Sequence, residues 1–238
     1  WLRQHNMAPM LRKLQTKTSA SLLYGNLSCN GRCVAYVHHA EVIVVPDSSV
    51  LSGNPTPVVV RLPIKDEVVV KQARFIELGG TDYLVVAGQH ALQIYTGDGK
   101  KCIHLQPVLS PGTAEAPRSA RRPPLTLLHV YMYMSLPCGA PYLATPPYLA
   151  HPLTLLHPLA SFFRGLAGVT AGGGDFLCAG TSSGEIALLA CNAGSFGHPV
   201  VLKEQGTAIC DLDAAPYPEN PDECLMASAD SSNHLLTT

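Results

Sequence analysis

One short pattern occurs four times in this 238-residue chain. In each copy, an apolar run that ends in or near a small residue leads through a polar turn into a second apolar run. The first runs end at residues 37, 87, 179 and 227, so neighbouring copies are about 50, 92 and 48 residues apart. Short runs rich in Val, Ile and Tyr, bounded by turn residues, are typical of β-strands. We therefore expect an all-β chain built from repeated hairpins.

Each copy predicts an antiparallel pair of strands, and such hairpins recurring every ~40–50 residues are typical of propeller blades with four short strands each. The expected pairs are Val34–Val37 with Val42–Val45, Leu84–Ala87 with Leu92–Tyr95, Phe176–Ala179 with Glu185–Leu189, and Leu225–Ala227 with His234–Leu236. The sequence therefore predicts a partial β-propeller of about four blades.

The long middle spacing coincides with an unusual segment. Pro123–Phe163 contains no Asp, Glu, Lys or Arg, holds many prolines, and repeats short words such as Pro-Leu-Thr-Leu-Leu-His. Closely spaced prolines oppose both a continuous helix and a membrane span. We expect this segment to form no part of the sheets. The predicted organisation is an N-terminal segment 1–24, blades in 25–107, an irregular, disordered Pro-rich insertion in 108–162, and blades truncated at the C-terminus in 163–238.

Charge and cysteine content limit the expected partners. Lys+Arg number 16 and Asp+Glu 17, whereas nucleic-acid and anionic-membrane binding draw on clustered basic charge. Trp1–Tyr24 lacks the apolar core of a secretory signal. Eight cysteines occur without a C-x-x-C pair, which favours free thiols in a reducing compartment. We expect a cytoplasmic protein with no cofactor, no metal, no nucleic acid and no membrane partner.

The last copy resembles the WD-repeat family. Its segment Ala227–Leu236 is similar to the second strand, turn and third strand of a WD repeat, in which a Ser and an Asp fix the turn by hydrogen bonds. Ser228 and Asp230 occupy those places. Further matches in the same order are Asn26–Ser28, Leu84–Tyr95, Phe163–Leu166, Gly174–Ile186 and Gly206–Asp213. No Trp-Asp pair closes a third strand, and Gly206-Thr207 stands where the family has Gly-His.

The resemblance implies a non-catalytic scaffold for protein–protein interactions. In that family, the turns between second and third strands open on one rim, where loops are free to bind. The residues that would form this binding rim here are His38, His39, Gln89, His90, Thr181, Ser182 and Ser231.

Two alternatives remain open at this point. Gly180–Gly184 fits the G-x-S-x-G pattern of a serine hydrolase, with Ser182 as nucleophile and Asp211 and His234 in triad order. That hypothesis needs a helix over Glu185–Ala190. The second alternative is a mis-predicted fragment without independent function.

Two weaker patterns are more typical of turns than of sites. Gly97–Lys101 lacks the first glycine and the Ser or Thr of a phosphate loop. His38, His39 and His90 suggest a metal but lack an evident further ligand.

Overall fold

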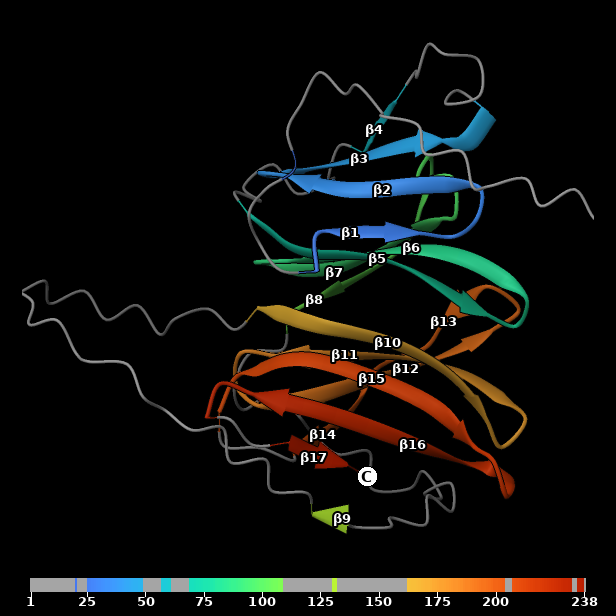
Figure 1. Ribbon diagram of the computed structural model, residues 1–238, viewed down its shortest axis with the longest axis vertical. Coiled ribbons are helices and arrows are strands. Elements are labelled where there is room, and N and C mark those ends of the chain that lie inside the picture. Colours follow the sequence, from blue (N-terminus) through green and yellow to red (C-terminus); the bar gives the residue numbers. More distant parts are fainter. Residues whose placement is uncertain are drawn as a thin grey trace, which may run out of the picture.

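The computed structural model describes residue 20 and residues 25–48, 57–60, 69–108, 130–131, 162–203, 207–232 and 235–237. Its elements are strands arranged in four antiparallel sheets, which stand side by side in chain order (Figure 1). The expected all-β architecture is therefore confirmed.

The first two sheets each run from first to last strand in sequence order. Sheet one consists of β1 (Leu27–Cys29), β2 (Cys33–His38), β3 (Glu41–Pro46) and β4 (Val58–Val60). Sheet two consists of β5 (Val70–Leu78), β6 (Thr81–Gly88), β7 (Ala91–Thr96) and β8 (Cys102–Pro107).

The last two sheets keep the same order for their first three strands. Sheet three consists of β10 (Phe163–Ala171), β11 (Gly174–Thr181), β12 (Glu185–Asn192), and β13 (Ser195–Phe196) and β14 (Val200–Lys203), which both pair with β12. Sheet four consists of β15 (Ile209–Tyr217), β16 (Asn220–Asp230), β17 (Leu235–Thr237) and β9 (Val130–Tyr131).

The four predicted hairpins are confirmed where the chain is described. β6 pairs with β7 from Tyr83↔Thr96 to Ala87↔Leu92, and β11 pairs with β12 from Asp175↔Cys191 to Gly180↔Ile186. The pairs β2–β3 and β16–β17 follow the same antiparallel pattern. Gly97–Gly99 forms the expected turn, in which the Gly99 N–H donates to the Thr96 carbonyl at 2.7 Å.

One expectation about the Pro-rich segment is wrong. Phe163 begins β10, and Val130 and Tyr131 form β9, whose register is Leu236↔Tyr131 and Thr237↔Val130. The physical reason is the open edge of β17, whose N–H and C=O groups accept another strand. Residues 125–136 contain no proline, so their backbone is able to pair. Apart from Val130, Tyr131, Phe162 and Phe163, this segment lies outside the described residues.

Apolar side chains on both faces of the sheets form the core. Along β6, Tyr83, Val85 and Ala87 belong to the cluster between sheets two and three, whereas Leu84 and Val86 belong to the cluster between sheets one and two. Successive residues of a strand point to opposite faces. A sheet packed on both sides therefore needs continuous apolar runs rather than alternation. A third cluster lies between sheets three and four.

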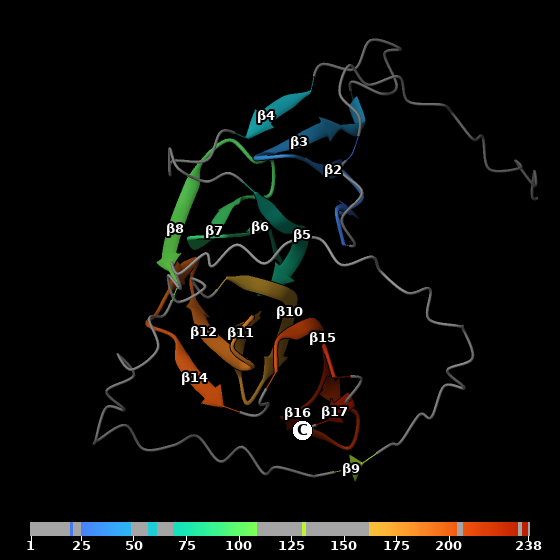
Figure 2. The same cartoon turned by 90° about the vertical axis from the view of Figure 1, so that its left-hand side faces the viewer.

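The first strand of each sheet lies innermost. These inner strands, β1, β5, β10 and β15, contact one another in chain order, and the sheets fan outward from them (Figure 2). Arg74 on β5 joins three of these strands. Its Nη1 donates to the Leu166 carbonyl on β10 at 2.7 Å and to the Leu212 carbonyl on β15 at 3.4 Å. Its Nη2 lies 3.7 Å from Asp213 Oδ1.

Asp230 accepts a hydrogen bond within the turn after β16. Asp230 is buried and accepts the Ser232 N–H at 3.0 Å, which closes its own turn. Its other carboxylate oxygen accepts the hydroxyl of Thr207, which precedes the inner strand β15. Ser228 is also buried, two residues earlier on the same face of β16. Thr207, which stands where the family has His, therefore links the turn to the inner strand.

Replacing Arg74 with Met should lower the free energy of unfolding by about 1–2 kcal/mol, because hydrogen bonds from charged groups contribute ~1.5–3 kcal/mol and this side chain is partly exposed. Urea unfolding followed by circular dichroism measures the change. Arg32→Met at an exposed turn is the matched control and should stay within about 0.5 kcal/mol. Equal effects of the two substitutions would show that the inner-strand ties contribute nothing.

Replacing Asp230 with Ala should lower stability by about 1–2 kcal/mol, because a buried turn loses two acceptor bonds. Thr207→Val removes only the hydroxyl that Asp230 accepts. A double-mutant cycle between the two positions should give a coupling energy of at least about 0.5 kcal/mol, the range found for residues in contact. Strictly additive effects would contradict the link between this turn and β15.

Candidate functional site

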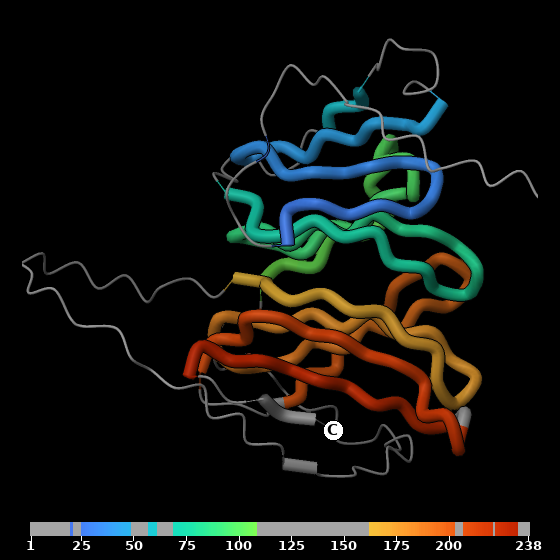
Figure 3. The backbone as a smooth tube through the Cα atoms, viewed as in Figure 1, coloured from blue at the N-terminus to red at the C-terminus, as the bar shows by residue number. Residues whose placement is uncertain are grey.

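The turns between second and third strands gather at one end of the fold, at the left of Figures 1 and 3. They join β2 to β3, β6 to β7, β11 to β12 and β16 to β17. The inner strands begin at this same end, whereas the turns between first and second strands lie at the opposite end. We call the first set the turn rim. The structure thus brings the predicted binding turns of four sheets to one side.

The predicted residues differ in their exposure on this rim. His39, His90 and Ser231 are exposed, and His38, Gln89 and Ser182 are half-buried. Thr181 is only 1% exposed, so its assignment as a rim contact is wrong. Its Oγ1 accepts the Glu185 N–H at 3.0 Å and lies 2.9 Å from Ser183 Oγ. Thr181 therefore holds its turn from within. The binding role of the other residues stays a prediction.

Two rim turns are tied to neighbouring segments through their backbones. The His39 carbonyl accepts the Val70 N–H at 3.1 Å, and the His90 carbonyl accepts the Val108 N–H at 2.9 Å. His39 has φ 54°, in the left-handed region that most residues avoid. The His38 and His39 rings meet edge-on, with centroids 4.6 Å apart. These contacts fix where the turns sit on the rim.

Ser182 binds the residue that precedes β10. Its N–H donates to the Phe162 carbonyl at 2.9 Å, and its Oγ accepts the Phe162 N–H at 3.0 Å. Lys71 Nζ lies 4.6 Å from the centroid of the Phe162 ring. Glu185 begins the strand β12, so the strand–turn–helix geometry of the hydrolase hypothesis is not formed.

The other parts of the hydrolase hypothesis have different roles or are undescribed. A Cβ on Gly180 would meet Ile209 Cγ2 at 2.4 Å and the Arg164 carbonyl oxygen at 2.6 Å, so this glycine permits close packing on the inner strands. Gly184 has φ +83°, which the tight turn requires. Asp211 is exposed and its Oδ1 accepts the Leu212 N–H at 3.0 Å. His234 lies outside the described residues.

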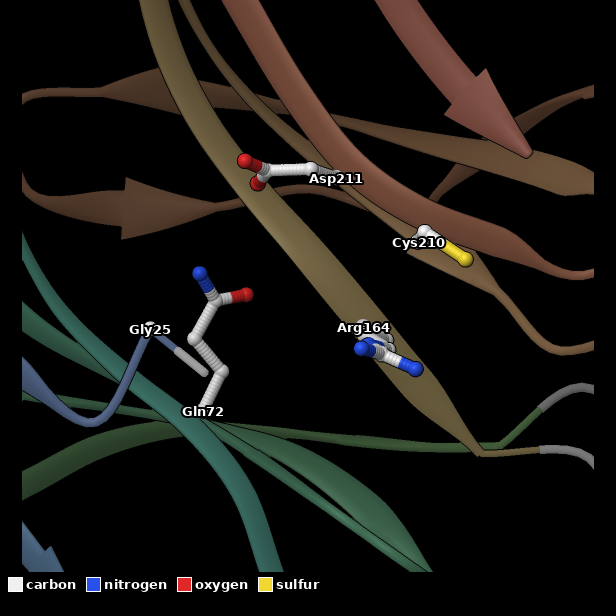
Figure 4. A pocket seen from close by; sticks show the side chains of 5 residues that line it. All are labelled: Gly25, Gln72, Arg164, Cys210 and Asp211. Atoms are coloured by element: carbon white, nitrogen blue, oxygen red, sulfur yellow. The ribbon is translucent and has the colours of Figure 1, made fainter. Parts of the chain in front are cut away.

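A pocket opens among the inner strands at the turn rim. Its volume is about 290 Å³, and Gly25, Gln72, Arg164, Cys210 and Asp211 line it (Figure 4). We call it the inner pocket. In Figure 4 the Gln72 amide and the Asp211 carboxylate point into the same space. The strands β5, β10 and β15 all begin at this end of the fold. The pocket lies among the first residues of these strands.

The inner pocket is lined by one basic side chain, one acidic side chain and the neutral amide of Gln72. Gln72 is 8% exposed, and its Oε1 accepts the Gly165 N–H at 2.9 Å, which fixes the amide between β5 and β10. The side chain of Arg164 makes no hydrogen bond or ion pair with the described residues. No nitrogen of Arg164 lies within ion-pair distance, 4.0 Å, of Asp211 in this part of the chain. The pocket therefore presents one cation and one anion that do not neutralise each other.

Other chemistries find little support in the described part of the chain. No group of three or more His, Cys, Asp or Glu is placed there to hold a metal ion. Asp98 accepts the Thr96 hydroxyl and the Lys100 N–H, which lowers the pKa of its carboxyl. Lys100 Nζ lies 3.2 Å from Asp98 Oδ2, so the cation that a phosphate loop would need is already paired within the turn. No described helix is long and apolar enough to cross a membrane.

The described cysteines are free thiols. Burial raises the pKa of Cys178 to about 12, with a smaller contribution from nearby Cys224. Burial also raises the pKa of Cys33, Cys102 and Cys224. The thiolate is the reactive form, so these four thiols are poor nucleophiles at neutral pH.

Sequence reasoning missed Gln72, Arg164 and Cys210 as pocket residues, and it considered Asp211 only for a catalytic triad. These residues share no sequence motif. The one available signal was positional, since each lies near the start of an inner strand, where the linkers between repeats end.

No protein-family model matches the sequence, and no curated protein sequence matches it. Among solved structures, a chain in the crystal structure of the mitotic checkpoint complex matches with a TM-score of 0.52 and 13% identity, over 100% of this chain and 58% of that one. The computationally designed Ika4 protein has a TM-score of 0.47 and 11% identity, over 96% and 98% of the two chains. The Myceliophteria thermophila Cps50 (Swd1) β-propeller domain has a TM-score of 0.27 and 13% identity, over 87% and 67%.

This chain thus spans a little over half the length of the mitotic checkpoint chain that it matches. At such low identity the likeness concerns the fold alone. The structure itself has four antiparallel sheets that fan out from inner strands in contact with one another. The described chain is an all-β, partial β-propeller.

Proposed function

We propose that this chain is a non-catalytic WD-repeat scaffold that binds a protein partner on the turn rim. The observation that carries the proposal is the convergence of four turns and an open, polar inner pocket at one end of the sheets. Concave sites bounded by variable loops on a rigid framework are common binding sites. The resemblance of Gly174–Ile186 and Gly206–Asp213 to WD repeat-containing protein 54 supports the family assignment.

The chemistry of the rim favours a protein segment over a nucleic acid. Exposed groups of the turns include the imidazoles of His39 and His90 and the hydroxyl of Ser231. Neutral hydrogen-bonding groups suit the polar rim of a protein interface. Phosphate backbones instead require many clustered cations. The proposed partner is therefore a cytoplasmic protein, and neither nucleic acid nor membrane is part of the proposal.

The proposal predicts that a triple substitution on the rim weakens partner capture. The substitutions are His39→Asn, His90→Ala and Ser231→Ala, where Asn is chosen because it tolerates the left-handed backbone at position 39. Capture by the purified, immobilised chain from cytoplasmic extract, quantified by mass spectrometry, should fall at least about fivefold for the specific partner, equivalent to roughly 1 kcal/mol.

A matched control changes three exposed residues at the opposite end, Lys101→Ala, Asn192→Ala and Glu219→Ala. It should retain every partner captured by the unchanged chain. Unfolding midpoints of both triple variants establish that neither loses the fold. Loss of the same partner from the control, or full retention by the rim variant, would place the binding surface elsewhere.

A further inference from the structure

We infer that the inner pocket selects partner segments in which an acidic and a basic side chain lie close together in sequence. This inference rests on the proposed function, because it specifies which protein segments the turn rim accepts. It concerns the five pocket residues and no turn residue, so the two claims can be tested separately.

The size of the inner pocket limits its ligand to a few side chains. Its volume of about 290 Å³ lies just below the range of small-ligand pockets, roughly 300–1,000 Å³. Gly25 leaves room on one wall, where an added Cβ would lie 2.8 Å from Gln72 Nε2. The opposite wall comes from Cys210 and Asp211 at the start of β15. A short stretch of partner chain fits this space, whereas a folded element does not.

The two charges of the pocket are held apart by backbone packing. Gly165 follows Arg164, and a Cβ on it would lie 3.0 Å from the carbonyl carbon of Asp211 and from the Leu212 nitrogen. The backbones of β10 and β15 are therefore in close contact next to Arg164 and Asp211. Asp211 is turned toward its own strand by the Leu212 N–H. In Figure 4 the Arg164 side chain lies apart from the Asp211 carboxylate.

The surroundings strengthen this separation of charge. On the side of Arg164, a second cation is present: Lys71 lies over the ring of Phe162, and Phe162 is two residues before Arg164 in the sequence. On the other side, Asp213 lies two residues after Asp211 along β15, is largely exposed, and has its Oδ1 3.7 Å from Arg74 Nη2. Arg164 and Asp211 are the two charged residues that line the pocket itself.

A ligand with both charges is the one that satisfies both groups. A guanidinium binds carboxylates through two parallel hydrogen bonds, and Asp211 has an acceptor oxygen left for an ammonium or guanidinium. Arg164 is partly exposed and Asp211 exposed, so neither ion pair is strong. Charges of this kind contribute more to the choice of partner than to affinity. The expected effect is a preference among segments.

The test uses an array of acetylated hexapeptides built on Gly and Ser, with Lys, Glu or Gln at two positions separated by zero to three residues. The fluorescently labelled full chain should bind Lys–Glu peptides about fivefold to tenfold better than Lys–Lys, Glu–Glu or Gln–Gln peptides. One of the tested separations should be preferred, because the two pocket charges are fixed by the backbone.

Charge reversal at each position should change the preference in opposite directions. Arg164→Glu should favour Lys–Lys peptides, and Asp211→Lys should favour Glu–Glu peptides. Arg164→Gln and Asp211→Asn serve as neutral variants if a reversal impairs folding, and each should abolish the advantage of the Lys–Glu peptides. Lys101→Glu at the opposite end is the matched control and should bind as the unchanged chain does.

The outcomes distinguish the two claims. An array without preference, together with reduced partner capture by the rim variant, would overturn the inference and leave the proposed function standing. A preference that does not change on reversal at either position would also overturn the inference. A switched preference supports it, even if the rim variant retains partner capture and thereby overturns the proposed function.

Discussion

The arrangement of the four sheets depends on polar ties between their inner strands. Apolar packing holds neighbouring sheets face to face, but it is non-directional and fixes no register between strands. Arg74 bonds the carbonyls of Leu166 and Leu212, and Gln72 bonds the N–H of Gly165. These hydrogen bonds are directional. They fix how far β5, β10 and β15 are shifted relative to one another along the strand direction. The positions of the turn rim and of the inner pocket depend on this alignment.

Within each repeat, the strands are held by apolar packing, whereas the turns of the rim are held by hydrogen bonds. Strands such as β6 are apolar on both faces because a sheet lies on each side. The turns differ because each is held by its own contacts: Asp230 with Thr207, Ser182 with Phe162, and Thr181 within its turn. His39 and His90 are exposed on these turns. The framework thus decides which turn residues are available.

The repeat made much of the fold predictable from sequence. The β2–β3, β6–β7, β11–β12 and β16–β17 hairpins follow from local strand propensity and turn residues, which act over a few positions. The role of Asp230 was also accessible, because its contact with Ser232 lies within one turn. Thr181 was not, because a pattern shared by four turns does not reveal which turn points its hydroxyl inward. Val130–Tyr131 was missed because its partner strand lies about 105 residues away in sequence.

By itself, the sequence determined most of the strands and their pairing into hairpins, because strand propensity and turn residues act over a few neighbouring positions. Only the tertiary structure decided that Gln72, Arg164, Cys210 and Asp211 line one pocket. These residues come from three different repeats. From Gly25 of the first repeat, Gln72, Arg164 and Asp211 follow at intervals of 47, 92 and 47 residues, close to the intervals between the repeats themselves, so they occupy equivalent places at the inner strands. They meet because inner strands of successive sheets pack against one another, with Gly165 allowing β10 to approach β15 closely. Such contacts depend on how the four sheets pack around their inner strands, and no pattern within a few residues encodes that packing.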